Sequence, residues 1–199
     1  MLKATGALLA AAILVTVGAR VGPLAAAAIG RATGSVPNVH VRTQNNQEVR
    51  FYDDLVKGKI VMINFMFTSC TTLCPRSTEN LMRVQQVLGE HVGKDIFLIS
   101  VSVDPDHDTP EVLKRYAEQH HVKAGWVFVT GTNEDIDTIR RRFRAYEGGD
   151  KAQHTGMLIY GDDARGAWAA MPAMVSPTMI AQSVLRLVTL KRISESTGS

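Results

Sequence analysis

Hydrophobic and polar positions alternate along the first part of the folded chain in a pattern typical of strands. Two short alternating segments, 39–43 and 48–51, flank a polar turn and predict a small β-hairpin. A turn or short helix at 53–59 follows. Continuous apolar runs at 60–67 and 96–103 then predict strands that are covered on both faces.

Apolar residues with helical spacing fill the segment between these two runs. They predict a helix that ends at Gly89 or Gly93. After the second run, Asp108 or Thr109 can cap a helix that runs from 110 to about 120.

The remaining pattern continues the alternation of strands and helices. A strand at 126–130 leads into a helix that begins near 131–135. A strand at 154–160 is followed by an antiparallel neighbour at 167–171, and Ser176 caps a final amphipathic helix.

This order of elements predicts an α/β protein, with a central mixed β-sheet flanked by helices and an N-terminal β-hairpin. With 199 residues, of which 45% are hydrophobic, the chain has enough apolar surface for one core. We expect a linker at 31–38, one folded domain at 39–191 and a flexible tail at 192–199.

The first 30 residues predict export. Lys3 precedes an uncharged stretch at 4–19, whose length lies between that of a signal-peptide core and that of a membrane-spanning helix. Segment 1–30 is therefore expected to be a signal peptide or a membrane anchor, and both alternatives stay open. A buried helix fits poorly, because the stretch has no amphipathic face. The expected location is the extracytoplasmic side of a membrane, the periplasm or its equivalent.

The charge balance gives little support to nucleic-acid binding. The chain has 22 basic and 19 acidic residues, a net charge of +3. Its densest basic cluster, at 140–142 with Arg144, is typical of the solvated face of a helix.

The only two cysteines, Cys70 and Cys74, stand where a strand is expected to lead into a helix. A helix N-terminus lowers the pKa of a thiol, and thiolates select soft metals, so this pair is a redox dithiol, a soft-metal site, or both. A purely structural disulfide is the alternative, but it would close too short a loop to constrain the unfolded chain much.

Three segments of the chain resemble the Sco/SenC family of copper-binding, thioredoxin-like proteins that assist assembly of the copper site in cytochrome c oxidase. They are the Cys-x-x-x-Cys-Pro motif at 70–75, the segment Ser-Val-Asp-Pro-Asp-His-Asp-Thr-Pro-Glu-Val-Leu at 102–113, and His154-Thr155. The likeness extends over about 39–190.

The resemblance implies a thioredoxin-like fold and a copper site. Its ligands would be Cys70, Cys74 and His154, since two thiolates and one imidazole suit Cu(I). Asp104 would orient His154 or tune the sulfurs, because a metal-binding histidine usually donates its other N–H to an acceptor. The implied partner is a copper-accepting protein, a cytochrome c oxidase subunit, with the membrane as a further partner if the N-terminal segment is uncleaved.

Two segments depart from the family pattern. The turn at 160–166 and the short stretch at 148–153 differ from the expected loops, although all three expected ligands are present. These departures affect the expected loop shape, and with it the partner.

A second function, that of an extracytoplasmic thiol–disulfide oxidoreductase using Cys70 and Cys74, stays open. Thioredoxin-type reductases space their thiols by two residues and place a proline before the facing strand, whereas this chain has three residues and His154-Thr155. Both differences favour a metallochaperone over an enzyme. A combined role, in which the dithiol reduces the cysteines of a copper-accepting partner, is also open.

The other histidines and the late methionines have simpler interpretations. His107 is expected to be an exposed loop residue, and His120-His121 a pair at a helix C-terminus. Met171, Met174 and Met179 are expected to fill gaps in the core.

Overall fold

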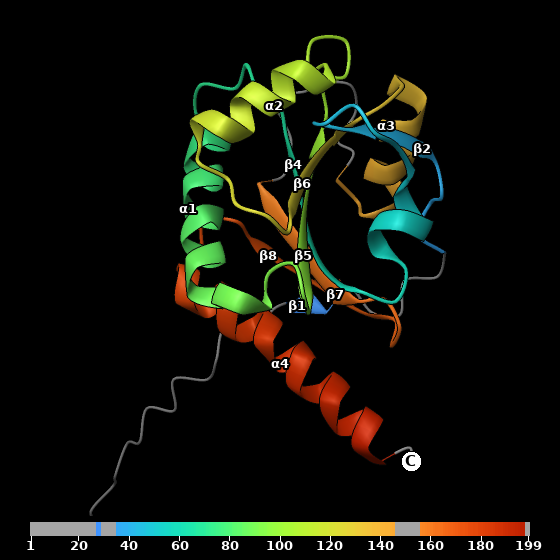
Figure 1. The fold of residues 1–199 in the computed structure, drawn as a ribbon, viewed down its shortest axis with the longest axis vertical. Helices are drawn as coiled ribbons and strands as arrows, with labels where there is room; N and C mark the ends of the chain where they lie inside the picture. The colour runs from blue at the N-terminus through green and yellow to red at the C-terminus, as the bar shows by residue number, and fades with distance from the viewer. Residues whose placement is uncertain (1–26, 29–34, 146–155, 198–199) are drawn as a thin grey trace, which may run out of the picture.

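A mixed sheet of eight strands, in the order β1-β8-β7-β4-β5-β6-β2-β3, organises the protein (Figure 1). The computed structural model describes residues 27–28, 35–145 and 156–197. The strands are β1 (Ala27–Ala28), β2 (His40–Thr43), β3 (Glu48–Arg50), β4 (Ile60–Met66), β5 (Ile96–Ser102), β6 (Trp126–Thr130), β7 (Met157–Asp162) and β8 (Ala167–Pro172). The α-helices are α1 (Leu73–Leu88), α2 (Pro110–Gln119), α3 (Asn133–Arg142) and α4 (Pro177–Thr197), with a π-helical turn η1 (Phe51–Val56) and a 3-10 turn η2 (Gly89–His91).

The three central strands β4, β5 and β6 are parallel, and their neighbours are antiparallel. Every residue of β4 is buried, which explains the unbroken apolar run in the sequence. Alternate β4 side chains enter two different cores: Met62 packs on one face of the sheet and Ile63 on the other.

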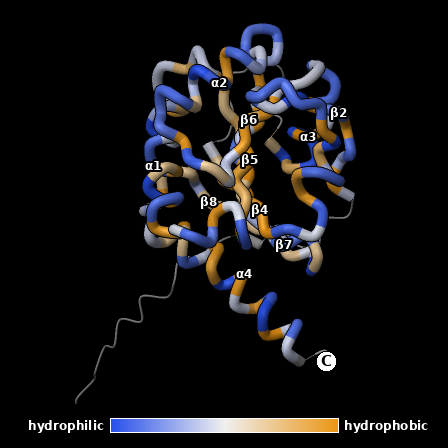
Figure 2. Tube along the Cα trace, in the orientation of Figure 1, coloured by the Kyte–Doolittle hydropathy of each residue, from blue (hydrophilic) through white to orange (hydrophobic). Residues whose placement is uncertain are grey.

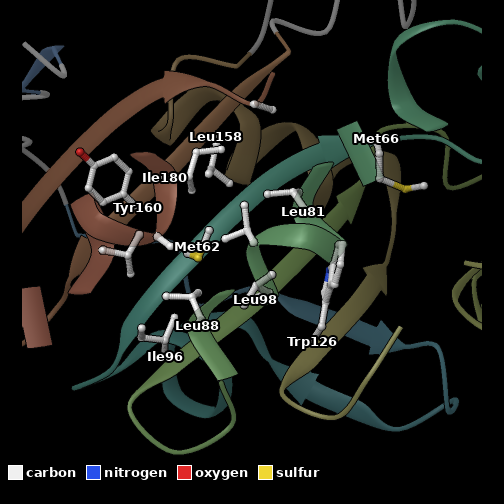
Figure 3. Close-up of a cluster of buried hydrophobic side chains, with 14 of the residues drawn as sticks. Met62, Met66, Leu81, Leu88, Ile96, Leu98, Trp126, Leu158, Tyr160 and Ile180 are labelled. Atoms are coloured by element: carbon white, nitrogen blue, oxygen red, sulfur yellow. The ribbon is translucent and has the colours of Figure 1, made fainter. Parts of the chain in front are cut away.

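Helices cover both faces of the sheet. Buried residues of α1, α2 and α4 share one core with Met62, and Figure 3 shows Leu81, Leu98 and Ile180 around that methionine. Helix α3 and η1 cover the opposite face through residues such as Phe51 and Ile136. In Figure 2 the apolar stretches follow the central strands, while the helices carry hydrophilic residues between their apolar positions.

A buried chain of hydrogen bonds joins the three parallel strands. Trp126 Nε1 donates to Ser100 Oγ at 2.8 Å, and Ser100 Oγ donates to Asn64 Oδ1 at 2.7 Å. Because these polar groups have partners, they can lie in the core without a large desolvation cost.

The parallel arrangement brings three loops to one edge of the sheet. The residues that follow the carboxyl ends of β4, β5 and β6 lead into α1, α2 and α3. This edge therefore carries both the cysteine motif and the segment with Asp104, and ligand sites in open α/β sheets usually lie there.

Most of the elements expected from the sequence are confirmed. β2 and β3 form the hairpin, and the caps of α2 and α3 are threonines: Thr109 Oγ1 accepts from Val112 N, and Thr132 Oγ1 accepts from Asp135 N. Helix α1 ends at Leu88, with Gly89 as its cap at φ 54°.

Three details differ from expectation. Helix α4 continues to Thr197, past residue 191, where we expected the folded domain to end. In β7 the strand begins at Met157, and residues 154–155 lie outside the described part. The expectation of a fully solvated basic face on α3 is wrong for Arg140, which is only 5% exposed, because its side chain binds Asp137 and the carbonyl of Ala145.

The N-terminal prediction falls almost wholly on residues that the structure does not describe. Within segment 1–30 only Ala27–Ala28 is described, and it pairs with Ala169–Ala170 of β8. Among the described helices, none combines the length and the apolar character that crossing a membrane requires.

Candidate metal and redox site

Cys70 and Cys74 lie at the junction of β4 and α1, and neither is in a disulfide. Both are buried, with 8% and 2% of their surfaces exposed. The loop is pinned at its start, because the backbone N–H of Cys70 donates to the carbonyl of Phe67 at 3.3 Å.

The sulfur of Cys70 occupies the position of a helix cap. The N-cap residue of α1, Thr72, makes no side-chain cap bond, and the backbone N–H of Cys74 instead donates to Cys70 Sγ at 3.3 Å. The first N–H groups of a helix carry partial positive charge and have no partner within the helix, so they favour a negatively charged sulfur here.

The two thiols consequently differ in acidity. Burial acts to raise the pKa of Cys70, but hydrogen bonds from the Cys74 side chain and from the backbone N–H groups of Cys74, Thr72 and Leu73 outweigh it and lower that pKa. Burial, together with the hydrogen bond to Cys70, raises the pKa of Cys74 to about 12. Cys70 is therefore the first thiolate to form and the stronger candidate nucleophile.

Asp108 fastens the cysteine loop to β5. Its carboxylate is fully buried and accepts hydrogen bonds from Thr68 N at 3.1 Å, from the Thr68 hydroxyl, and from Ser102 Oγ at 2.6 Å. Thr68 stands two residues before Cys70, so this carboxylate fixes the start of the loop. The sequence pattern indicated Asp108 only as a possible cap, because hydrogen bonds between distant segments leave no local signal.

Asp104, the residue expected to orient His154, lies at the same edge of the sheet. Its side chain is 8% exposed, and its Oδ1 lies 2.9 Å from Nδ1 of His107, whose side chain is 75% exposed as expected for a loop histidine. The backbone N–H of Asp104 donates to Ser102 Oγ at 3.0 Å, next to the bond between Ser102 and Asp108. Asp104 and Asp108 thus share one anchoring serine.

His154, the third expected ligand, lies outside the described residues. Within the described ranges, no group of three or more His, Cys, Asp or Glu side chains is arranged to hold a metal ion. Of the three expected ligands, the structure therefore brings together the two cysteines.

Gly156, the first residue described after His154, packs against the cysteine motif. It has φ +55°, and a Cβ at this position would lie 2.8 Å from Cδ2 of Leu73, the residue before Cys74. Its carbonyl accepts a hydrogen bond from Ala173 N at 2.8 Å. Both the positive φ and the close approach favour glycine here, which fixes the chain next to the start of α1.

The remaining histidines have structural contacts of their own. His120 is the C-cap of α2, as expected, and its ring lies 4.4 Å from that of Tyr116; burial lowers its pKa. Nδ1 of His91 lies 2.6 Å from Asp95 Oδ2, and Nδ1 of His40 lies 3.2 Å from Glu48 Oε1.

Comparison with known proteins identifies one family. The family model described as SCO1/SenC matches residues 40–189. The chain spans about half the length of curated relatives such as a SCO2-like protein of Rickettsia felis, which is 33% identical over 96 residues, 48% of this chain and 45% of the relative.

Solved structures share the fold. BsSco, described as a member of the Sco family of cytochrome c oxidase assembly proteins with a disulfide switch, is 25% identical at a TM-score of 0.64, covering 78% of this chain and 94% of that one. Bradyrhizobium japonicum ScoI, solved with copper bound, is 24% identical at a TM-score of 0.62, covering 74% and 96%. The thioredoxin-like fold is thereby confirmed.

Proposed function

This chain belongs to the SCO1/SenC family, and from that premise we propose that it is a copper-binding protein of cytochrome c oxidase assembly, whose ligands are Cys70, Cys74 and His154. Copper is its cargo. The protein delivers the metal to a copper-accepting partner, a cytochrome c oxidase subunit, or prepares the copper site of that partner.

The observation that carries this proposal is the reduced dithiol at the start of α1, with Gly156 packed on Leu73, the residue before Cys74. His154 precedes Gly156 by two residues, so its Cα is at most about 7 Å from that of Gly156. We propose that the imidazole of His154 reaches the sulfurs from there. Two thiolates and a neutral imidazole form a donor set that suits Cu(I).

The chemistry of the two thiols sets the conditions for loading. Copper must displace the proton of Cys74, whose pKa is raised to about 12 by burial, so binding releases protons. A disulfide of a partner can oxidise the pair by thiol–disulfide exchange: the partner disulfide takes up the two electrons and becomes two thiols, Cys70 and Cys74 form a disulfide, both thiolate ligands are lost, and the chain then releases its cargo. In this proposal the redox state of the dithiol controls copper binding.

The proposed location is the extracytoplasmic side of a membrane. The uncharged stretch at 4–19 supports export, and residues 1–30 are proposed to be either an anchor or a cleaved leader, followed by the linker and the folded domain. Asp104 is proposed to orient His154, since its buried carboxylate lies at the dithiol edge of the sheet.

The second candidate function is thiol–disulfide exchange. It is favoured by one observation: the backbone N–H of Cys74 donates to Cys70 Sγ at 3.3 Å, while Cys74 itself is more deeply buried. These contacts lower the pKa of Cys70 and raise that of Cys74, which is the arrangement of an attacking and a resolving thiol.

Metal analysis of the full chain, reduced and purified in detergent, separates the two functions. We expect stoichiometric copper in the parent chain and in His107→Ala, the matched variant with an exposed histidine. Cys70→Ala and His154→Ala are expected to lose it. If His154→Ala retains the parental copper content, His154 is not a ligand. If the parent holds no copper but reduces a disulfide substrate at a rate that His154→Ala does not change, the oxidoreductase replaces the chaperone.

A further inference from the structure

The methionines near the end of the chain divide between the core and the surface. Met171 is 7% exposed and belongs to the core that also contains both cysteines, as the sequence pattern predicts. Met174 is 46% exposed and Met179 is 42% exposed, so the prediction that they fill the core is wrong. Met174 therefore leaves an apolar side chain on the surface, in the loop between β8 and α4.

The backbone around Met174 is held against α1. Asn80 Nδ2 donates to the carbonyls of Ala173 at 2.7 Å and Val175 at 2.8 Å, the two residues that flank Met174. Ser77 Oγ donates to Met174 Sδ at 3.9 Å. The loop thus presents its exposed methionine at a fixed place beside α1.

The surface next to Met174 combines positive charge with apolar side chains. Positions 76, 80, 83 and 87 follow the helical repeat, so they lie on one face of α1. Val87, the last of them, is 50% exposed. A hollow of about 200 Å³ on this face is lined by Met174, Arg76, Glu79, Asn80 and Arg83.

Arg76 and Arg83 differ from other arginines of the protein in having no ion-pair partner among the described residues. Guanidinium nitrogens of four other arginines lie 3.0–3.4 Å from a carboxylate oxygen; these are Arg42, Arg115, Arg140 and Arg192. Within the described ranges, no carboxylate oxygen lies within 4 Å of Arg76 or Arg83, although Glu79 stands between them on the helix. Two unpaired positive charges beside one carboxylate attract anionic groups to this face.

This face of α1 begins next to the dithiol. Arg76 follows Cys74 by two residues, and Arg83 lies seven residues further along, which places the Cα atoms of the two arginines about 10 Å apart. A segment that contacts both arginines therefore has one end beside the cysteines.

We propose that Arg76, Arg83, Val87 and Met174 form a docking surface for an acidic segment of the copper-accepting partner. Guanidinium groups bind carboxylates through paired hydrogen bonds, and the two arginines select carboxylates about 10 Å apart, three residues in an extended chain. Aliphatic side chains between these carboxylates cover Met174. That the partner accepts copper depends on the proposed function, whereas the recognition of an acidic segment does not.

Docking on this surface guides the cysteines of the partner to the copper site. In the transfer, bonds from copper to its ligands in this chain break as bonds to two partner sulfurs form. The protons of the partner thiols pass to Cys70 and Cys74. Copper stays Cu(I), so no electron donor or acceptor is needed.

Binding is tested first, with the full chain reduced and metal-free in detergent. The probe is a reduced, dye-labelled peptide in which Asp-Leu-Leu-Asp precedes a Cys-x-x-x-Cys pair, and its twin has asparagines in place of both aspartates. By fluorescence anisotropy we expect the aspartate peptide to bind about fivefold more tightly than its twin. The difference should shrink as salt is added, because exposed ion pairs are screened.

Variants of this chain locate the binding. Arg83→Glu should abolish the preference for the aspartate peptide. Arg165→Glu makes the same change of charge at an exposed arginine in the turn between β7 and β8, and it should keep the preference. Met174→Ser should weaken both peptides alike, since it removes only apolar contact. If the two peptides bind the parent equally, or if Arg83→Glu and Arg165→Glu have equal effects, the docking surface is overturned.

Guided transfer is tested with the copper-loaded parent chain. Copper is expected to reach the aspartate peptide severalfold faster than its asparagine twin, and Arg83→Glu should remove this difference. Equal transfer rates in the parent would refute the guiding role. If the parent chain holds no copper while the metal-free chain still prefers the aspartate peptide, the proposed function fails and the docking surface stands.

Discussion

At the scale of single residues, position in the fold gives two chemically identical thiols opposite roles. Cys70 receives backbone N–H groups at the start of α1, whereas Cys74 lies deeper in the core, 2% exposed. Sequence alone places both cysteines near a helix N-terminus and cannot rank them. The ranking depends on which sulfur the N–H groups face and which one is desolvated.

This difference predicts selective alkylation of the native chain. At pH 8 the lowered pKa of Cys70 leaves more thiolate than an ordinary cysteine has, while a pKa of about 12 leaves Cys74 almost fully protonated. Iodoacetamide should therefore modify Cys70 first, and Cys74 should become reactive only as the pH rises toward 12. Tandem mass spectrometry of the peptide 60–76 locates the label.

The unfolded chain is the control, because unfolding removes the burial and the hydrogen bonds that set the two thiol pKa values apart. In urea both thiols should titrate near the ordinary value and react at similar rates. Equal labelling of Cys70 and Cys74 in the native chain would contradict the assigned acidities.

At the scale of elements, the cysteine loop is positioned by a neighbouring strand and not by its own sequence. Asp108 joins the loop after β4 to the end of β5, and it does so from the segment that leads into α2. The buried strands, the hairpin and the cap of α2 were predictable, because periodicity and capping are local signals. The anchoring by Asp108, the burial of Arg140 and the exposure of Met174 were not, because each depends on contacts between segments distant in sequence or on packing.

We expect Asp108→Asn to destabilise the chain and loosen the dithiol. The amide keeps the shape of the side chain but loses the charge and one acceptor oxygen, so bonds from Thr68 and Ser102 are weakened or lost. The expected loss in free energy of unfolding is about 2–3 kcal/mol, measured by urea denaturation of the reduced chain. The preference of iodoacetamide for Cys70 should fall as well.

Asp106→Asn is the matched control for this prediction. Asp106 lies in the same loop and is exposed, and its Oδ1 accepts from Asn133 Nδ2 at 2.9 Å. Its replacement should change stability by no more than about 0.5 kcal/mol. If the two substitutions cost the same, Asp108 does not hold the loop.

At the scale of the whole molecule, the proposed copper site draws its ligands from segments that are far apart in the sequence. Cys70 and Cys74 belong to the junction of β4 and α1, and His154 precedes β7, which pairs with β4. The resemblance of the sequence to the Sco/SenC family predicts this ligand set. The described residues support it through Gly156, whose position no sequence pattern indicates.

A ligand set that spans these segments couples copper binding to global stability. In the proposed site folding brings the three ligands together, so Cu(I) is expected to bind the native chain better than the unfolded one. At a free Cu(I) concentration 100 times the dissociation constant, the reduced chain should gain about 2.7 kcal/mol. For a domain of this size that gain raises Tm by about 5–10 °C. The oxidised chain should gain nothing, because a disulfide offers no thiolate ligand. Thermal unfolding of the reduced, oxidised and His154→Ala chains, each with and without Cu(I), measures this coupling. If Cu(I) raises the Tm of reduced His154→Ala as much as that of the reduced parent, the cysteines alone hold the metal.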